Sequence, residues 1–174
     1  MAIDSSRVAR GGLDIGTLTP SRRAAYERLL DVLEHSPSGA VAVSGGVDSM
    51  TLAVIAGRLR SDTRMFHAVS PAVPAAATAR VRAYAASEGW DLQVLDAGEF
   101  NDPAYRRNPV NRCYFCKSNL YASMSAATGR LLWSGTNTDD LGDYRPGLEA
   151  AREHGVSHPY VDAGIDKDTV RALA

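Results

Sequence analysis

Short apolar runs alternate with longer helical patterns along most of the chain, and this alternation constrains the fold more than any other feature. Strands that are separated by helices pair in parallel through right-handed crossovers, and helices then cover both faces of the sheet. We therefore expect an α/β fold, a doubly wound and mostly parallel open sheet, with ligands at the carboxyl ends of its strands. The expected strands are 40–43, 65–69, 92–95, 131–134 and a short fifth at 160–161, and the expected helices are 20–33, 47–59, 75–88, 114–127, one within 139–154 and one from about 167.

The 174 residues fit one domain, and 45% hydrophobic with 22% charged residues is the composition of an ordinary globular protein. Residues 1–18 show little periodicity, so we expect a mobile lead-in followed by one domain over 19–174. The chain stops within what reads as a helix, which predicts either a piece of a longer protein or a short member of a longer family.

A net charge of -1 gives no general attraction to nucleic acid or to anionic membranes. The apolar runs fall far short of the ~20 residues that span a bilayer, and the N-terminal residues do not form a secretory signal. We expect a cytoplasmic protein that binds neither a membrane nor a long nucleic acid.

The strongest local motif is Ser44-Gly-Gly-Val-Asp-Ser49, which lies directly between an expected strand and an expected helix. Two glycines allow the backbone to approach a ligand closely, and the N-terminus of the following helix offers unpaired N–H groups to an anion. The two serine hydroxyls can donate to phosphate oxygens, and Asp48 can hold a divalent cation or orient the loop. A simple strand-to-helix turn is the alternative. The expected phosphate-binding residues are Ser44, Gly45, Gly46, Val47, Asp48 and Ser49.

The hexapeptide resembles the PP-loop of the ATP pyrophosphatases, also called adenine nucleotide α-hydrolases, which belong to the Rossmann-like HUP fold type. Proteins of this group use ATP to adenylate an oxygen and release pyrophosphate. The resemblance implies that adenine lies against Val69 and Ser70 after the second strand, and against Gly135, Thr136 and Asn137 after the fourth. The alternative for the second segment is that it only turns the chain and caps the next helix.

The only two cysteines are Cys113 and Cys116, at the start of an expected helix. The helix N-terminus, Arg112 and Lys117 all favour a thiolate there. A reactive thiol that carries sulfur or forms a transient disulfide is one interpretation. Two inert buried cysteines are another, and a structural zinc site is a third, although the four histidines provide no paired ligands.

Residues 137–147 place three carboxylates and an arginine behind the expected nucleotide contact. Asp139 or Asp140 can bind Mg²⁺ through oxygen, as Asp48 can. Arg145 can clamp a carboxylate or phosphate in a bidentate way, and Arg112 and Asp143 complete the expected acceptor-binding set. A solvated helix start is the alternative for this run of charge.

Together these motifs resemble the LarE-type ATP-dependent sulfurtransferases over about residues 20–174. The resemblance includes Ser44–Ser49, the segment 111–117, Gly135–Gly147 and the Ala163-Gly-x-x-Lys167-x-x-Val-Arg171 pattern. That family adenylates a carboxylate of a pyridinium mononucleotide and transfers sulfur from one of its own cysteines. The family's sacrificial cysteine lies beyond residue 174, so either the sequence is a piece that lacks it, or the sulfur passes through Cys113 or Cys116.

We therefore expect an ATP- and Mg²⁺-dependent sulfurtransferase that forms AMP and pyrophosphate, with Asp48, Cys113 and Cys116 as catalytic residues. Cys113 would carry the sulfur and Cys116 would resolve the disulfide. The acceptor is expected to be a small nucleotide-like molecule, either a pyridinium mononucleotide or a guanine nucleotide thionated as in 6-thioguanine formation. A cysteine desulfurase is the expected sulfur donor, and the chain is expected to form a homo-oligomer. The alternatives are an amidating PP-loop synthetase and a nucleotide-binding domain without catalysis.

Overall fold

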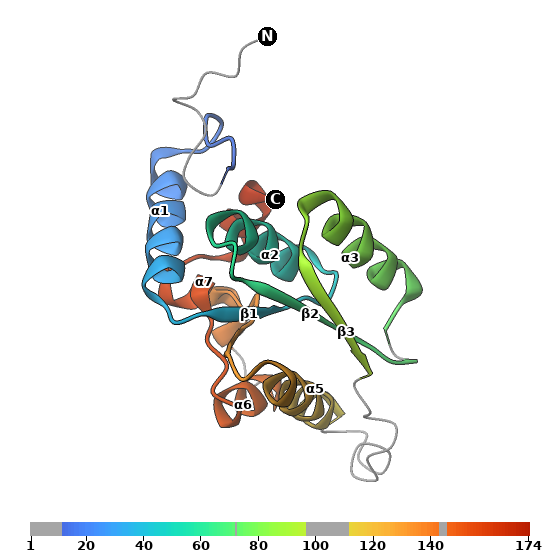
Figure 1. The fold of residues 1–174 in the computed structure, drawn as a ribbon. Coiled ribbons are helices and arrows are strands. Elements are labelled where there is room, and N and C mark those ends of the chain that lie inside the picture. Colours follow the sequence, from blue (N-terminus) through green and yellow to red (C-terminus); the bar gives the residue numbers. More distant parts are fainter. Residues whose placement is uncertain (1–11, 72, 97–111, 143–145) are drawn as a thin grey trace.

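A parallel four-stranded sheet organises the chain (Figure 1). The computed structural model describes residues 12–71, 73–96, 112–142 and 146–174, with the backbone alone at residues 112 and 113. The strands are β1 (Gly39–Ala42), β2 (Arg64–Val69), β3 (Asp91–Asp96) and β4 (Leu131–Trp133), in the spatial order β3-β2-β1-β4. In the centre of the sheet, Val41 pairs with Met65 on one side and with Trp133 on the other. The predicted doubly wound α/β fold is confirmed.

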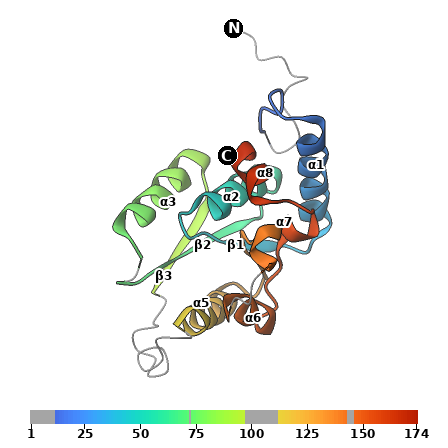
Figure 2. The ribbon, with the colours of Figure 1, turned by 180° about the vertical axis from the view of Figure 1, so that it is seen from behind.

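Helices cover both faces of the sheet, because successive strand residues point to opposite sides. Val41, Met65 and Trp133 face one core, which packs against α1 (Pro20–His35), α2 (Val47–Leu59) and α8 (Lys167–Leu173). Ala40, Phe66 and Leu132 face a second core under α5 (Arg112–Thr128) and α6 (Pro146–Glu153). Figures 1 and 2 show α5 and α6 on the face opposite α2, while α3 (Ala75–Glu88) lies beside α2.

The expected fifth strand at 160–161 is wrong. The structure has a short helix there, α7 (Pro159–Asp162), and the residue that pairs with β4 is Ser157, just before this helix, through an isolated bridge to Trp133. Pro159 has no N–H for a strand ladder but suits the first turn of a helix. Tyr160 and Val161 form a short apolar run, a pattern that does not by itself distinguish a strand from a buried helical turn.

The N-terminal segment before α1 packs on the domain where the structure describes it. Leu18 is buried in the first core, and Leu13 and Ile15 pack against the same core. Thr19 caps α1 by accepting a hydrogen bond from the Arg22 N–H at 3.4 Å. Among the described helices, none combines the length and apolar character that a membrane crossing requires.

The strand order creates a crevice between β1 and β4. The chain moves outward from β1 through β2 to β3 and then returns to place β4 on the other side of β1. The segment after β1 continues into α2 on one face, whereas the segment after β4 leads through the 3-10 helix η3 (Thr138–Leu141) to α6 on the other face. Open α/β sheets bind ligands where neighbouring strands diverge in this way.

Candidate functional site

The loop from Ser44 to Ser49 joins β1 to α2, as predicted, and its backbone needs glycine at its second position. Gly45 has a φ of +85°, a region that L side chains rarely adopt. A Cβ atom there would lie 2.9 Å from the Ala77 carbonyl oxygen and 3.1 Å from the Ala77 Cα. The loop therefore packs directly on the first turn of α3, and a side chain at position 45 would separate them.

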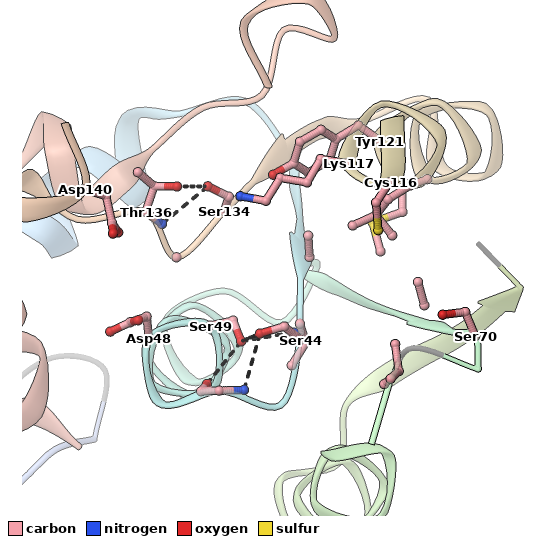
Figure 3. A pocket seen from close by; sticks show the side chains of 18 residues that line it. Ser44, Asp48, Ser49, Ser70, Cys116, Lys117, Tyr121, Ser134, Thr136 and Asp140 are labelled. Atoms are coloured by element: carbon pink, nitrogen blue, oxygen red, sulfur yellow. Dashed lines mark hydrogen bonds between the residues drawn. The ribbon is translucent and has the colours of Figure 1, made fainter. Parts of the chain in front are cut away.

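Serine hydroxyls close the loop on itself (Figure 3). The Ser44 N–H donates to Ser49 Oγ at 3.0 Å, and Ser49 Oγ donates to the Gly46 carbonyl at 3.1 Å. The two hydroxyls are 3.0 Å apart, and the Gly46 N–H donates to Ser44 Oγ over a longer 3.3 Å. The hydroxyls thus hold the loop in shape, which leaves anion binding mainly to the backbone amides and the start of α2.

A cavity of about 390 Å³ opens beside this loop at the carboxyl ends of β1, β2 and β4. Figure 3 shows Ser44 and Ser49 on one side of the cavity and Cys116, Lys117 and Tyr121 of α5 across from them. The lining residues are Ala42, Val43, Ser44, Gly46, Asp48, Ser49, Ala68, Ser70, Val73, Cys116, Lys117, Leu120, Tyr121, Met124, Ser134, Gly135, Thr136 and Asp140.

Asp48 is held by residues from the C-terminal part of the chain. The Lys167 ammonium donates to both carboxylate oxygens of Asp48, at 2.6 Å to Oδ1 and more closely to Oδ2. The Tyr160 hydroxyl donates to the Asp48 carbonyl at 3.1 Å, and burial followed by the Asp48 charge raises the pKa of Tyr160. Asp48 therefore contributes little net negative charge to the cavity while Lys167 is in place.

The end of β4 touches the start of α2. A Cβ at Gly135 would lie 2.7 Å from the Ser49 nitrogen, so only glycine allows this backbone approach. Ser134 Oγ lies 2.7 Å from His158 Nδ1 and 2.9 Å from Thr136 Oγ1. Burial is the largest cause that lowers the pKa of His158, and Lys117 lowers it further.

The acidic residues after β4 form a helix cap. Asn137 accepts from the Asp139 N–H at 3.1 Å, and Asp140 Oδ2 accepts from the Asn137 N–H at 3.1 Å. Asp139 Oδ2 accepts from the Lys167 N–H at 3.1 Å. Within the described ranges, no cluster of three metal-ligating side chains occurs. Magnesium binding by Asp48, Asp139 or Asp140 stays a prediction.

Helix α5 forms the wall opposite the phosphate loop. The Cys116 thiol lines the cavity, and burial together with the Cys116 charge raises the pKa of Tyr121 to about 12. The Lys117 side chain passes over Gly147 of α6, where a Cβ would lie 2.5 Å from Lys117 Cδ. Cys113 lies three residues before Cys116 in the same helix, but its side chain is outside the described part.

Most predicted site residues that the structure describes line one cavity. Gly45 and Val47 instead line a second cavity behind the loop, and Val69, Asn137 and Asp139 lie away from the lining. The predicted residues Asp143 and Arg145, and the side chain of Arg112, lie outside the described residues. The fold also brings here four residues that were not among the predicted site residues, although spacings of four and eight residues after Cys113 signal the first two: Lys117, Tyr121, Ser134 and Lys167. Of these, Lys117 was expected only to favour a thiolate.

Two curated proteins are similar in sequence, and both are uncharacterized. One, from Synechocystis sp., is 37% identical over 139 residues, which is 77% of this chain and 52% of that protein. The other, from Methanocaldococcus jannaschii, is 25% identical over 138 residues, with the same coverage of 77% and 52%. The chain spans about half the length of the curated relatives it matches. No protein-family model matches it.

Three solved structures share the fold. An NH₃-dependent NAD synthetase from Campylobacter jejuni, in complex with nitrate, has a TM-score of 0.65 and 15% identity, and the match covers 90% of this chain and 72% of that chain. A glutamine-dependent NAD⁺ synthetase from Acinetobacter baumannii, in complex with ADP, has a TM-score of 0.58 and 15% identity, with coverage of 88% and 30%. The U34-tRNA thiolase NcsA from Methanococcus maripaludis, with its 4Fe–4S cluster, has a TM-score of 0.60 and 18% identity, with coverage of 88% and 61%. This likeness confirms the Rossmann-like, HUP-type fold.

Proposed function

We propose that the chain is an ATP-dependent sulfurtransferase, which adenylates an oxygen of a small nucleotide-like acceptor, releases pyrophosphate and inserts sulfur through a cysteine. The observation that carries the proposal is that a glycine-rich loop suited to phosphate and the Cys116 thiol line the same cavity. A thiol at that position lies where an adenylated acceptor would have to bind.

The loop supports the nucleotide part of the proposal. Backbone amides and the start of α2 would hold the phosphates of ATP without rearranging as charge develops in the reaction. The structurally similar Acinetobacter baumannii synthetase is in complex with ADP. Gly135 and Thr136 line the same cavity beside the loop, and the resemblance predicted contacts to adenine at these two residues.

Mg²⁺ would accompany the triphosphate and neutralise part of its charge. Asp48 and Asp140 both line the cavity, and carboxylate oxygens suit this ion. Asp48 gives both of its oxygens to Lys167, so it takes a metal ion only if Lys167 moves away. Lys167 would then be released toward the phosphates.

The first chemical step joins an acceptor oxygen to the α-phosphorus of ATP and breaks the bond to pyrophosphate. In the second step, the terminal sulfur of a Cys116 persulfide attacks the activated carbon, and AMP leaves with the oxygen. A Cys113 thiolate then attacks the Cys116 sulfur, which releases the thiolated product and leaves a Cys113–Cys116 disulfide. An external thiol reduces this disulfide, and a cysteine desulfurase supplies the next persulfide sulfur.

These roles reverse the order that we expected from the sequence. The reversal follows from the placement of the Cys116 thiol in the cavity wall. The acceptors to compare are a pyridinium mononucleotide carboxylate and a guanine nucleotide, since both offer an oxygen that adenylation can activate.

An amide-forming synthetase is the second candidate, and the likeness to two NAD synthetases favours it. Such an enzyme also adenylates an oxygen, but ammonia then displaces AMP. Pyrophosphate release that depends on ammonia and not on a sulfur donor would favour this candidate.

The test is incubation of the protein with ATP, Mg²⁺, inorganic polysulfide and each acceptor, followed by mass spectrometry of nucleotides, acceptor and protein. We expect AMP, pyrophosphate and an acceptor that has exchanged one oxygen for sulfur. Cys116→Ser should still release pyrophosphate but transfer no sulfur, whereas Cys113→Ser should stop with the acceptor joined to Cys116 through a disulfide, which protein mass spectrometry detects. ADP and orthophosphate as the primary products, or full sulfur transfer by Cys116→Ser, would contradict the proposal.

A further inference from the structure

We infer that Arg80 is a positioning residue, which holds the phosphate loop from behind and aims the Gly46 amide into the nucleotide cavity. Arg80 lies on α3, outside that cavity, and its guanidinium Nη1 donates a hydrogen bond to the Gly45 carbonyl oxygen. The inference rests on the proposed phosphate-binding role of the loop.

The geometry of one peptide bond links the back of the loop to its front. The peptide between Gly45 and Gly46 is planar and trans, so its carbonyl and its N–H point in opposite directions. Gly45 and Arg80 line the second cavity of about 570 Å³ behind the loop, whereas Gly46 lines the nucleotide cavity. A carbonyl held at the back therefore directs the N–H to the front, where an anion binds.

The loop needs such a support because neither residue of this peptide has a side chain to restrict it. Two adjacent glycines allow the peptide to rotate at little steric cost, and rotation would withdraw the N–H from the cavity. In the structure this N–H donates to Ser44 Oγ at 3.3 Å, a long bond that a phosphate oxygen can replace. The helix α3 thus contributes two contacts to Gly45, the Ala77 backbone and the Arg80 side chain.

The charge of Arg80 also remains available to the loop. Glu88 is the acidic side chain among the described residues that line the second cavity, and both of its oxygens accept hydrogen bonds from Arg58 at 2.7 Å. Arg80 directs its guanidinium at the loop carbonyl instead. A cation behind the loop favours the binding of an anion in front of it.

The test compares Arg80→Ala with Arg82→Ala, which removes an exposed arginine from the same helix. Isothermal titration calorimetry measures the affinity for pyrophosphate, for ATP and for adenosine, which lacks phosphate. The variant loses a hydrogen bond from a charged group, and Arg80 is exposed, so we expect about tenfold weaker binding of pyrophosphate and ATP. Adenosine should bind Arg80→Ala as it binds the wild type, and Arg82→Ala should bind all three ligands normally.

Guanidinium rescue separates positioning from general stability. The space that Arg80 vacates adjoins the second cavity, so low concentrations of methylguanidinium should enter it and restore pyrophosphate affinity to Arg80→Ala. Unchanged pyrophosphate affinity in Arg80→Ala would overturn the inference, and so would an equal loss for adenosine without rescue. A wild-type protein that binds neither pyrophosphate nor ATP would overturn the proposed function, and this inference with it.

Discussion

Replacement of Gly45 by alanine tests how the phosphate loop is built, because two separate costs meet at this position. The backbone has a φ of +85°, and a Cβ would lie 2.9 Å from the Ala77 carbonyl oxygen and 3.0 Å from the Ala77 Cβ. The first cost is conformational and the second is steric. The chain offers one control position that carries only the conformational cost and another that carries neither cost.

Gly89 supplies the control for the conformational cost, and Gly46 supplies the control for the substitution itself. Gly89 has a φ of +67° but no atom within 4 Å of its ideal Cβ, so alanine there should lose only about 1–2 kcal/mol of unfolding free energy. Gly46 has a negative φ and meets only Ser44 Oγ at 3.4 Å, so its loss should stay below about 1 kcal/mol. Gly45→Ala adds an overpacking cost of about 1–3 kcal/mol to the conformational one, which predicts a total of about 2–5 kcal/mol.

The assay is urea unfolding of the wild type and the three variants, with circular dichroism as the signal that monitors unfolding. We expect Gly45→Ala to have the lowest free energy of unfolding of the four proteins, followed by Gly89→Ala and then Gly46→Ala. Gly45→Ala should also lose pyrophosphate binding, whereas Gly89→Ala should keep it. If Gly45→Ala destabilised the protein no more than Gly89→Ala does, the described packing of the loop on α3 would be refuted.

Three further changes probe the surroundings of the loop. Lys167→Met leaves the Asp48 carboxylate without its cation beside the phosphate site, so ATP affinity measured by calorimetry without Mg²⁺ should fall about tenfold or more. Lys167→Arg should keep most of this affinity, and equal affinities of wild type and Lys167→Met would contradict the expectation. Gly135→Ala places a Cβ 2.7 Å from the backbone of α2 and should cost about 1–3 kcal/mol of unfolding free energy, measured with urea. Gly142→Ala, whose Cβ would lie 4.0 Å from the Asp139 carbonyl oxygen, should be nearly neutral, and similar losses would refute the close approach. Burial lowers the pKa of His158 from its ordinary 6.5, so the unfolded chain binds the proton first and stability is lost as the pH falls below that value. His158→Asn should therefore reduce the difference in unfolding free energy between about pH 7.5 and about pH 5.5, and an unchanged difference would contradict the role of burial.

The sequence predicts those parts of the fold whose signals are local. Helix α2 begins at Val47 and ends at Leu59, and α3 runs from Ala75 to Glu88, as the periodicity and the adjacent turns indicate. The failure at 160–161 has a local cause as well. The apolar residues Tyr160 and Val161 are compatible with either a strand or a buried helical turn, whereas Pro159 favours the first turn of a helix.

The candidate site is predictable where its residues are contiguous and unpredictable where the topology assembles it. Ser44–Ser49 stands out because strand, glycines and helix start follow one another. Lys167 reaches Asp48 across 119 positions, and nothing in the sequence around either residue specifies that contact. Similarly, a Cys-x-x-Cys spacing does not show which thiol faces a ligand, whereas the rotation of α5 against β1 and β2 places Cys116 in the cavity.

Protection of Cys116 by nucleotide is the direct test of the proposed function, because the proposed reaction requires ATP and this thiol to share one cavity. The protein is treated with iodoacetamide in the presence and absence of a non-hydrolysable α,β-methylene analogue of ATP, and peptide mass spectrometry follows each cysteine separately. Saturating analogue should slow the alkylation of Cys116 by about tenfold or more, and Gly45→Ala, which disrupts the phosphate loop, should weaken this protection. Alkylation of Cys116 at the same rate with and without bound analogue would contradict a shared site.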